Sequence, residues 1–129
     1  MGILKLFPSD IKVVVLIPCY NEEVTIASVV NGFRAALPHA SIYVYDNNST
    51  DQTVKLARAA GAIVRSEPLQ GKGFVIRRMF SDIDADFYVL VDGDATYDPG
   101  SAPEMLGTAY GHGLDMVNGA RVTDRVEAY

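Results

Sequence analysis

The sequence predicts an α/β fold, in which a mostly parallel sheet carries helices on its faces. Short apolar runs rich in β-branched residues alternate along the chain with segments of helical periodicity, which is the pattern of chains that build parallel sheets. Polar residues follow the end of each predicted strand. Crossovers in such sheets are right-handed, so these strand ends meet at the one edge where open α/β sheets bind ligands.

The first strand, helix and second strand lie within the first third of the chain. Residues 12–17 (KVVVLI) are a continuous apolar run, as expected of a strand buried on both faces. Residues 25–37 place apolar side chains at helical spacing, and the helix ends before Pro38, which cannot continue it. Residues 41–46 (SIYVYD) form the second predicted strand.

A second helix and a third strand follow. Ser49 and Gln52 have the spacing of a capping box, which predicts a helix start within residues 47–62. Gly61 stands where many helices end in a left-handed glycine. Residues 62–67 (AIVRSE) then form a short third strand that ends before a proline.

A third helix and a fourth strand complete the central part of the chain. Residues 70–83 predict a helix, and residues 86–92 (DFYVLVD) predict the strand after it. The buried face of this helix is expected to consist of Ile76, Met79, Phe80 and Ile83.

The C-terminal part predicts one more helix and one more strand. Residues 101–111 form a short helix that Gly111 and Gly113 are expected to break, and residues 114–120 form a fifth strand. The expected domain therefore spans residues 11–121, with an N-terminal extension at 1–10 and a tail at 122–129.

Composition excludes several classes of protein. The chain has 129 residues and a formal net charge of -5, whereas nucleic-acid-binding domains usually present a basic face. Cys19 is the only cysteine, so neither an internal disulfide nor a cysteine metal cluster can form. The sequence shows no signal peptide and no apolar run of transmembrane length. We expect a cytoplasmic protein, with residues 1–10 able to touch the inner face of a membrane.

The predicted strand ends converge in chemistry as well as in space. The fourth strand runs into Asp92 and Asp94, two carboxylates that repel each other unless a cation lies between them. Mg²⁺ is commonly held by one or two carboxylates together with substrate phosphates. One interpretation of Asp92 and Asp94 is therefore a metal and diphosphate site at this edge. The other is that they cap a helix or lie in a solvated turn.

Four better-known motifs do not fit the same residues. An EF-hand loop beginning at Asp92 would have Tyr97 where glycine is required and Pro103 where glutamate is required. The segment DGDAT matches the start of haloacid-dehalogenase-like phosphatases, but no lysine follows Lys72. GKG is not a phosphate-binding P-loop, because Ser66 replaces its first glycine, and Ile76 replaces the third glycine of a dinucleotide fingerprint.

Five segments in this order resemble the family 2 glycosyltransferases of the GT-A fold, in particular the polyprenyl-phosphate sugar transferases of the dolichol-phosphate mannose synthase type. The resemblance covers residues 11–121 and rests on LIPCYNEE, VYDNNSTDQT, GKGFVIRRMF, YVLVDGDATYDP and MVNGAR. It implies a Rossmann-like α/β/α domain that binds a UDP- or GDP-linked sugar with Mg²⁺ or Mn²⁺. It also implies transfer of the sugar, with inversion, to a lipid phosphate such as a polyprenyl phosphate or to a glycan, in cell-wall or glycolipid biosynthesis.

The resemblance also assigns roles to individual residues. Asp92 and Asp94 would hold the metal, and Asp46 would contact the base or ribose. The donor-binding residues that it implies are Pro18, Tyr20, Asn21, Glu22, Asp46, Asn47, Gly71, Lys72, Asp92, Gly93 and Asp94.

The sequence departs from the family pattern at two places. Asn47 and Asn48 stand where many relatives have an acidic residue and a glycine, and the segments that supply the acceptor site and any general base lie beyond the fifth strand. We therefore expect a fold that is incomplete at its C-terminus and holds the donor-binding half, with no general base identified. A catalytically incomplete nucleotide-sugar-binding fragment that self-associates is the alternative, and a haloacid-dehalogenase-like phosphatase is a third.

Overall fold

The structure is a computed structural model that describes residues 11–112 and 116–118. Its centre is a sheet of five parallel strands in the order β3-β2-β1-β4-β5. The strands are β1 Val13–Cys19, β2 Ser41–Asp46, β3 Ile63–Ser66, β4 Phe87–Leu90 and β5 Met116–Asn118. The helices are α1 Ile26–Ala36, α2 Thr53–Ala59, α3 Lys72–Asp82, the 3₁₀ turn Pro99–Ser101 and α4 Ala102–His112.

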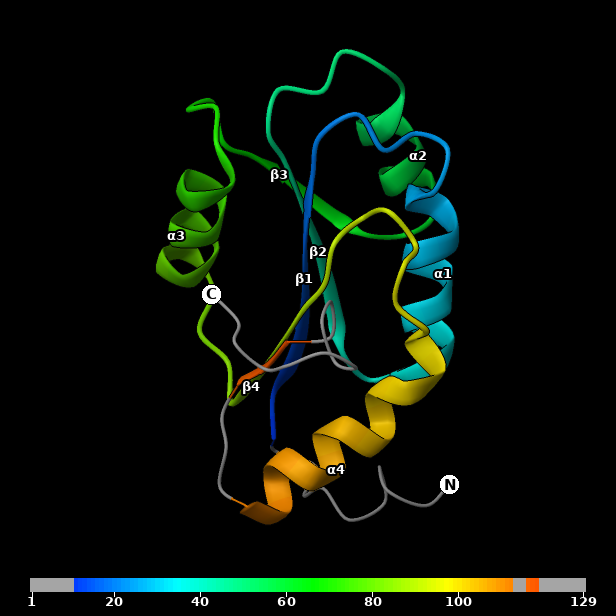
Figure 1. Cartoon of the computed structure of the whole chain (residues 1–129), viewed down its shortest axis with the longest axis vertical. Helices are drawn as coiled ribbons and strands as arrows, with labels where there is room; N and C mark the ends of the chain where they lie inside the picture. Colours follow the sequence, from blue (N-terminus) through cyan, green and yellow to red (C-terminus); the bar gives the residue numbers. More distant parts are fainter. Residues whose placement is uncertain (1–10, 113–115, 119–129) are drawn as a thin grey trace.

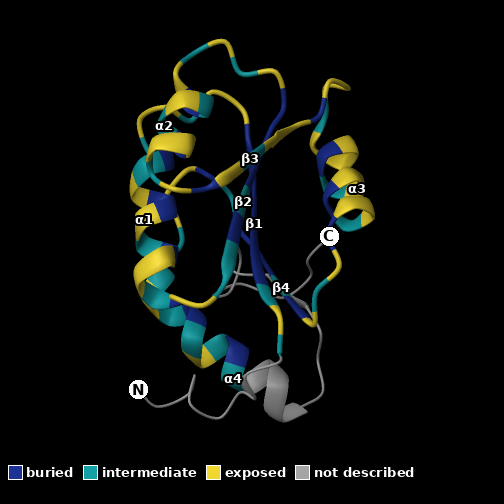
Figure 2. Ribbon diagram, turned by 180° about the vertical axis from the view of Figure 1, so that it is seen from behind, coloured by how far each residue is buried: buried dark blue, intermediate teal, exposed yellow. Residues whose placement is uncertain are grey.

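Helices cover both faces of this sheet, but unequally. Figure 1 and Figure 2 show α1, α2 and α4 on one side of the strands and α3 alone on the other. The first side holds the larger core, in which Phe33 and Leu106 pack against the sheet. The second holds a smaller core around Met79 and Tyr45. The predicted α/β fold with a parallel sheet and helices on its faces is confirmed.

Strand register fixes which residues meet at the edge where the parallel strands end. Cys19 at the end of β1 lies beside Asp46 at the end of β2, and Asp46 lies beside Ser66 of β3. The polar residues that follow these strands therefore emerge next to one another, as the alternation of the sequence predicts.

Local sequence signals place some helix ends correctly. Gly61, which follows α2, has a φ of 102° and so adopts the left-handed conformation that suits glycine. The side chain of Asp98 accepts a hydrogen bond from the N–H of Gly100 and caps the 3₁₀ turn. The described helices include none that is long and apolar enough to cross a membrane.

The predicted capping box of α2 is wrong. Gln52 is itself the N-cap, and its side chain makes no capping hydrogen bond. Asp51 Oδ1 instead accepts a hydrogen bond from the N–H of Thr53, while Ser49 Oγ accepts one from the N–H of Asn21, 28 positions away in the sequence. The hydroxyl of Ser49, which the local pattern assigned to the helix N-terminus, is thus hydrogen-bonded to a residue far away in the sequence.

Two further predictions about helices hold except at one residue each. The helix predicted at residues 101–111 is α4, which continues one residue past Gly111 to His112, so Gly111 does not break it; one glycine costs a helix only about 1 kcal/mol. Gly113 lies outside the described residues. On α3, the predicted buried face is confirmed: Met79 and Ile83 are buried, and Ile76 and Phe80 pack half-buried against the same core. Val75, which was not predicted, is buried there as well.

Candidate functional site

An open cleft of about 330 Å³ lies at the edge where the parallel strands end. This volume is at the lower end of the range for small-molecule sites. Loops after β1, β2, β3 and β4 all contribute to its walls. Its lining residues are Pro18, Cys19, Tyr20, Glu22, Asn47, Gln70, Gly71, Lys72, Val75, Asp92 and Asp94.

Most of the residues nominated from the sequence line this cleft. Asn21, Asp46 and Gly93 were also nominated but are not among its lining residues. Cys19, Gln70 and Val75 line it and were not nominated. Gln70 could have been recognised, because it belongs to the polar segment after the third strand, whereas Val75 carries no chemical signal in the sequence.

The loop after β1 is fastened to the loop after β2. The N–H of Asn21 donates to Ser49 Oγ over 2.8 Å, and Asn21 Oδ1 accepts from the N–H of Thr50 over 2.8 Å. The N–H of Glu22 donates to Thr53 Oγ1, again over 2.8 Å. Asn21 takes a positive φ of 52° in this arrangement. These bonds place Tyr20, which is half exposed, and Glu22 on one wall of the cleft.

Asp46, the last residue of β2, has one satisfied and one unsatisfied oxygen. The side chain is only 5% exposed. Its Oδ2 accepts a hydrogen bond from the N–H of Ser49 over 3.1 Å, whereas its Oδ1 is buried without any hydrogen-bond donor. Buried carboxylate oxygens are rarely left in this state. Because Asp46 does not line the cleft, a ligand would reach this atom only if the surrounding loops shift.

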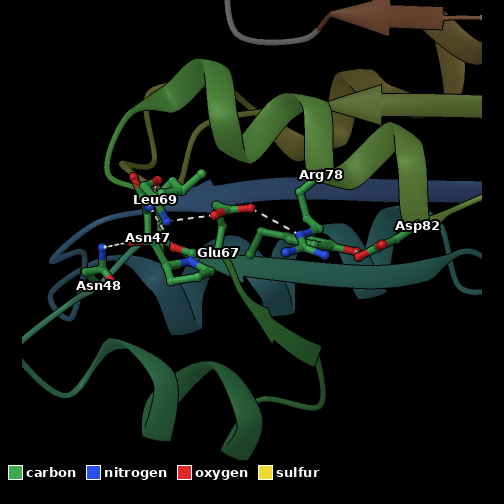
Figure 3. Close-up of polar contacts among 8 residues, drawn as sticks. Asn47, Asn48, Glu67, Leu69, Arg78 and Asp82 are labelled. Carbon is green, nitrogen blue, oxygen red and sulfur yellow. Dashed lines mark hydrogen bonds and ion pairs between the residues drawn. The ribbon is translucent and has the colours of Figure 1, made fainter.

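The next residue, Asn47, contacts the loop after β3. Its Nδ2 donates to the backbone oxygens of Glu67 over 2.8 Å and Leu69 over 2.9 Å. Its Oδ1 accepts from the N–H of Gly71 over 2.8 Å and from Gln70 Nε2 over 3.2 Å. The loop that leads into α3 is thus held against the end of β2 (Figure 3).

An ion pair joins the start of α3 to the end of the fourth strand. Lys72 Nζ lies 2.7 Å from Asp92 Oδ1, and the two side chains are 46% and 27% exposed. Because both groups reach solvent, we expect the pair to be rearranged easily by a charged ligand. It places one positive charge on the wall of the cleft beside two carboxylates.

The loop after β4 is shaped by backbone contacts around Gly93. The hydroxyl of Thr25 donates to the backbone oxygen of Gly93 over 2.5 Å. A Cβ at position 93 would lie 2.7 Å from Cys19 Sγ, so any larger residue would collide with the end of β1. Asp94 Oδ1 accepts from the N–H and the hydroxyl of Thr96 over 3.2 and 2.8 Å, and Asp94 is exposed.

The electrostatic field of the cleft is negative. Burial raises the pKa of Glu22, and the charges of Asp94, Asp92 and Asp51 raise it further. Burial, followed by the charge of Glu22 and the other carboxylates, raises the pKa of Cys19 far above its usual range. The Cys19 thiol therefore stays protonated and is no candidate for a nucleophile.

The carboxylate oxygens of Asp92 and Asp94 suit a divalent cation that is also coordinated by a bound ligand. Asp92 and Asp94 each present one carboxylate oxygen that makes no hydrogen bond to the described residues. Oxygen atoms are the ligands that Mg²⁺ prefers. Within the described part of the chain, however, His, Cys, Asp and Glu side chains form no group of three or more able to hold a metal by themselves. A cation at this loop would need oxygens from water or a substrate.

Comparison with known proteins gives a consistent picture. The family model described as glycosyl transferase family 2 matches residues 14–129. Protein RfbJ of Shigella flexneri is 60% identical over 110 residues, which is 85% of each chain. Glycosyltransferase AglJ of Haloferax volcanii is 39% identical over 118 residues, covering 91% of this chain and 38% of its own.

Solved structures of one enzyme superpose on the described fold. Glucosyl-3-phosphoglycerate synthase from Mycobacterium tuberculosis with Mg²⁺ and uridine diphosphate matches with a TM-score of 0.71 and 29% identity, over 83% of this chain and 43% of that one. The same enzyme with Mn²⁺, uridine diphosphate and phosphoglyceric acid matches with a TM-score of 0.69 and 29% identity, over 77% and 39%. The chain thus spans less than half of AglJ and of this synthase.

Proposed function

Because the chain belongs to glycosyl transferase family 2, we propose that its cleft binds a nucleoside-diphosphate sugar together with a divalent cation. We further propose that the sugar is transferred, with inversion, to a lipid phosphate or a glycan. The observation that carries the proposal is the position of Asp92, Asp94 and Lys72 around one cleft at the end of a parallel sheet. The family membership replaces the phosphatase hypothesis raised by the segment DGDAT.

Asp92 and Asp94 would hold the cation through the oxygens that the protein leaves open. When bound, a divalent cation supplies charge neutralisation for the departing diphosphate. Lys72 adds a positive charge to the same cleft, 2.7 Å from Asp92 Oδ1, and would move toward the diphosphate when that group binds. The synthase structures contain Mn²⁺ or Mg²⁺ with uridine diphosphate, which supports this assignment.

The nucleoside would occupy the part of the cleft nearest β1 and β2. Asp46 Oδ1 lacks a hydrogen-bond donor, which suits an N–H of a base or a hydroxyl of ribose. Pro18 and Tyr20 line the same wall, and the exposed ring of Tyr20 offers a flat apolar surface for stacking.

The two acceptor classes make different demands on the protein. A phosphate acceptor such as a polyprenyl phosphate is already an anion at neutral pH and can attack the sugar without losing a proton. A sugar hydroxyl of a glycan would require a general base, and we assign none to the described residues.

A second candidate is a nucleotide-sugar-binding protein that self-associates without catalysing transfer. It is favoured by apolar side chains that remain exposed close to the cleft. Leu69 is 57% exposed and Phe74 is 41% exposed, and they flank the cleft residues Gly71 and Lys72 in the sequence. Such side chains often mark contact surfaces for another chain.

Calorimetric titration of UDP and GDP, with Mn²⁺ and again with EDTA, tests the binding proposal. We expect one of the two nucleotides to bind with Mn²⁺ and its affinity to fall at least about tenfold with EDTA, as for a ligand whose charge the metal offsets. No binding of either nucleotide would refute it. Transfer of labelled sugar to a polyprenyl phosphate then separates the two candidates, because the second predicts binding and self-association without product.

A further inference from the structure

The side chain of Asn47 has used all of its hydrogen-bonding capacity inside the protein. A side-chain amide offers two N–H donors and two acceptor positions. Both donors face backbone oxygens, of Glu67 and Leu69, and the oxygen receives the N–H of Gly71 and the amide of Gln70. The residue is 4% exposed. It lines the cleft but keeps no group for a ligand.

These contacts require an amide and exclude a carboxylate. One end of the Asn47 side chain lies within 2.9 Å of two carbonyl oxygens, so that end must be the nitrogen. A carboxylate there would bring a negative oxygen against two acceptors without any donor, which is strongly unfavourable in a buried place. The opposite end lies 2.8 Å from the N–H of Gly71 and must be the oxygen.

We infer that Asn47 is a positioning residue, which fixes the loop 67–71 and the start of α3 so that Lys72 is held at the cleft. The inference rests on the proposed function, and it assigns no contact between Asn47 and the nucleotide. Gly71 is the N-cap of α3, has a φ of 137°, and its helix lacks a side-chain cap. Asn47 therefore holds the residue directly before Lys72, whose Nζ reaches Asp92.

Neighbouring contacts brace the same loop from both sides (Figure 3). Asn48 Nδ2 donates to the backbone oxygen of Pro68 and to Gln70 Oε1, each over 2.9 Å. The Glu67 carboxylate accepts from the N–H of Leu69 over 2.7 Å and from Arg78 Nε of α3 over 3.1 Å. None of these neighbouring contacts involves the N–H of Gly71. The side chain of Asn47 accepts that N–H and so joins the end of β2 to the N-cap of α3.

If Asn47 acts through Lys72, its substitution should matter only while Lys72 is present. We propose measuring UDP or GDP affinity, in Mn²⁺, for the unaltered chain, Asn47→Asp, Lys72→Met and the double variant. We expect Asn47→Asp to weaken binding about tenfold in the unaltered chain but less than about twofold in the Lys72→Met background, because coupled residues are not additive. Equal losses in both backgrounds would show a direct ligand and overturn the inference.

Backbone amide exchange provides a readout that needs no nucleotide. In Asn47→Asp we expect the Gly71 amide to exchange at least about tenfold faster, while the Val91 amide, which donates to the oxygen of Leu16 in the sheet, keeps its rate. Unchanged protection at Gly71 would overturn the inference. If the unaltered chain binds neither UDP nor GDP, the proposed function fails, and the exchange at Gly71 still decides whether Asn47 positions the loop.

A matched control and a reserve variant complete the design. Asn48→Ala removes two hydrogen bonds from the same loop but none at Gly71, so the exchange of Gly71 should change less than about twofold. An effect equal to that of Asn47→Asp would overturn the assignment to Asn47. Should Asn47→Asp lose its cooperative thermal transition, Asn47→Ala, which adds no charge, replaces it in both experiments.

Discussion

The loops after β2 and β4 lie at the same edge of the sheet but differ in how far their polar side chains are hydrogen-bonded within the protein. In the loop after β2, the side-chain amides of Asn47 and Asn48 donate hydrogen bonds to the loop before α3. The hydroxyl of Ser49 accepts a hydrogen bond from the N–H of Asn21. In the loop after β4, Asp92 pairs with the exposed Lys72, and the hydrogen bonds that Asp94 makes to described residues stay within its own loop.

This difference separates a scaffold from a binding element. Side chains whose hydrogen bonds are complete within the protein hold neighbouring loops in place and gain nothing from a ligand. Carboxylates whose oxygens lack hydrogen-bond donors destabilise the folded protein, because their negative charges repel one another. A bound cation removes this repulsion. Among the described residues, Asp46 at the end of β2 has a buried side-chain oxygen that lacks a hydrogen-bond donor. We therefore group Asp46 with the binding element.

The largest effect is expected for Asp94→Ala. If the β4 loop is completed by a cation, loss of this carboxylate should lower nucleotide affinity in Mn²⁺ by about a hundredfold, or nearly 3 kcal/mol. The free energy of unfolding should hardly change, since Asp94 is exposed. Calorimetry and chemical denaturation measure the two quantities.

Asp98→Ala is the matched control for this change. Asp98 is also exposed and acidic but caps the 3₁₀ turn Pro99–Ser101. Its substitution should cost about 1 kcal/mol of stability and leave metal-dependent binding unaltered. Equal nucleotide affinity in Asp94→Ala and the unaltered chain would remove the cation from the proposal.

A smaller effect, about tenfold in affinity, is expected for Asp46→Asn. Oδ2 must remain an acceptor for the N–H of Ser49, so the new amide nitrogen would take the place of the buried Oδ1. An acceptor would thereby become a donor and oppose an N–H or O–H of the nucleotide. Calorimetry with UDP and GDP measures the loss, and Asp86→Asn, the same change at a carboxylate that accepts the N–H of Lys12 before β1, is the control. Tighter or equal binding by Asp46→Asn would contradict a role in nucleoside recognition.

The sequence predicted the framework better than the contacts between loops. β2 begins and ends where its apolar pattern does, at Ser41 and Asp46, and the alternation of strands and helices predicted a single ligand-binding edge. Such features depend on residues close together in the chain. Ser49 illustrates the limit, because its spacing predicts a capping box while its hydroxyl bonds to Asn21, 28 residues away.

The candidate site shows the same division. Asp92 and Asp94 could be nominated because a strand that runs into two carboxylates is unusual on its own. The role now inferred for Asn47 depends on Glu67, Leu69 and Gly71, which lie about 20 residues further on. Nothing in the local sequence shows that an amide there will face two carbonyl oxygens, so sequence reasoning placed it only among the donor-binding residues.

The smallest effect at neutral pH is expected for Glu67→Gln, which tests the scaffold side of the comparison. The hydrogen bond from the N–H of Leu69, and then the guanidinium of Arg78, hold the pKa of Glu67 below its usual value of 4.5. A depressed pKa stabilises the fold at pH values above 4.5, and this contribution is lost as the pH falls through the folded-state value. Because Arg78 is 43% exposed, solvent weakens the pair.

The unaltered chain should therefore be more stable than Glu67→Gln near pH 6, and the difference should shrink as the pH is lowered toward about 3. Chemical denaturation across this range measures it, with the melting temperature as a second reading. Asp84→Asn, at an exposed position between α3 and β4, controls for the loss of one negative charge. A difference that stays constant with pH would mean that the Glu67 carboxylate does not hold the loop as an anion, and that the saturated amide of Asn47 fixes it without this help.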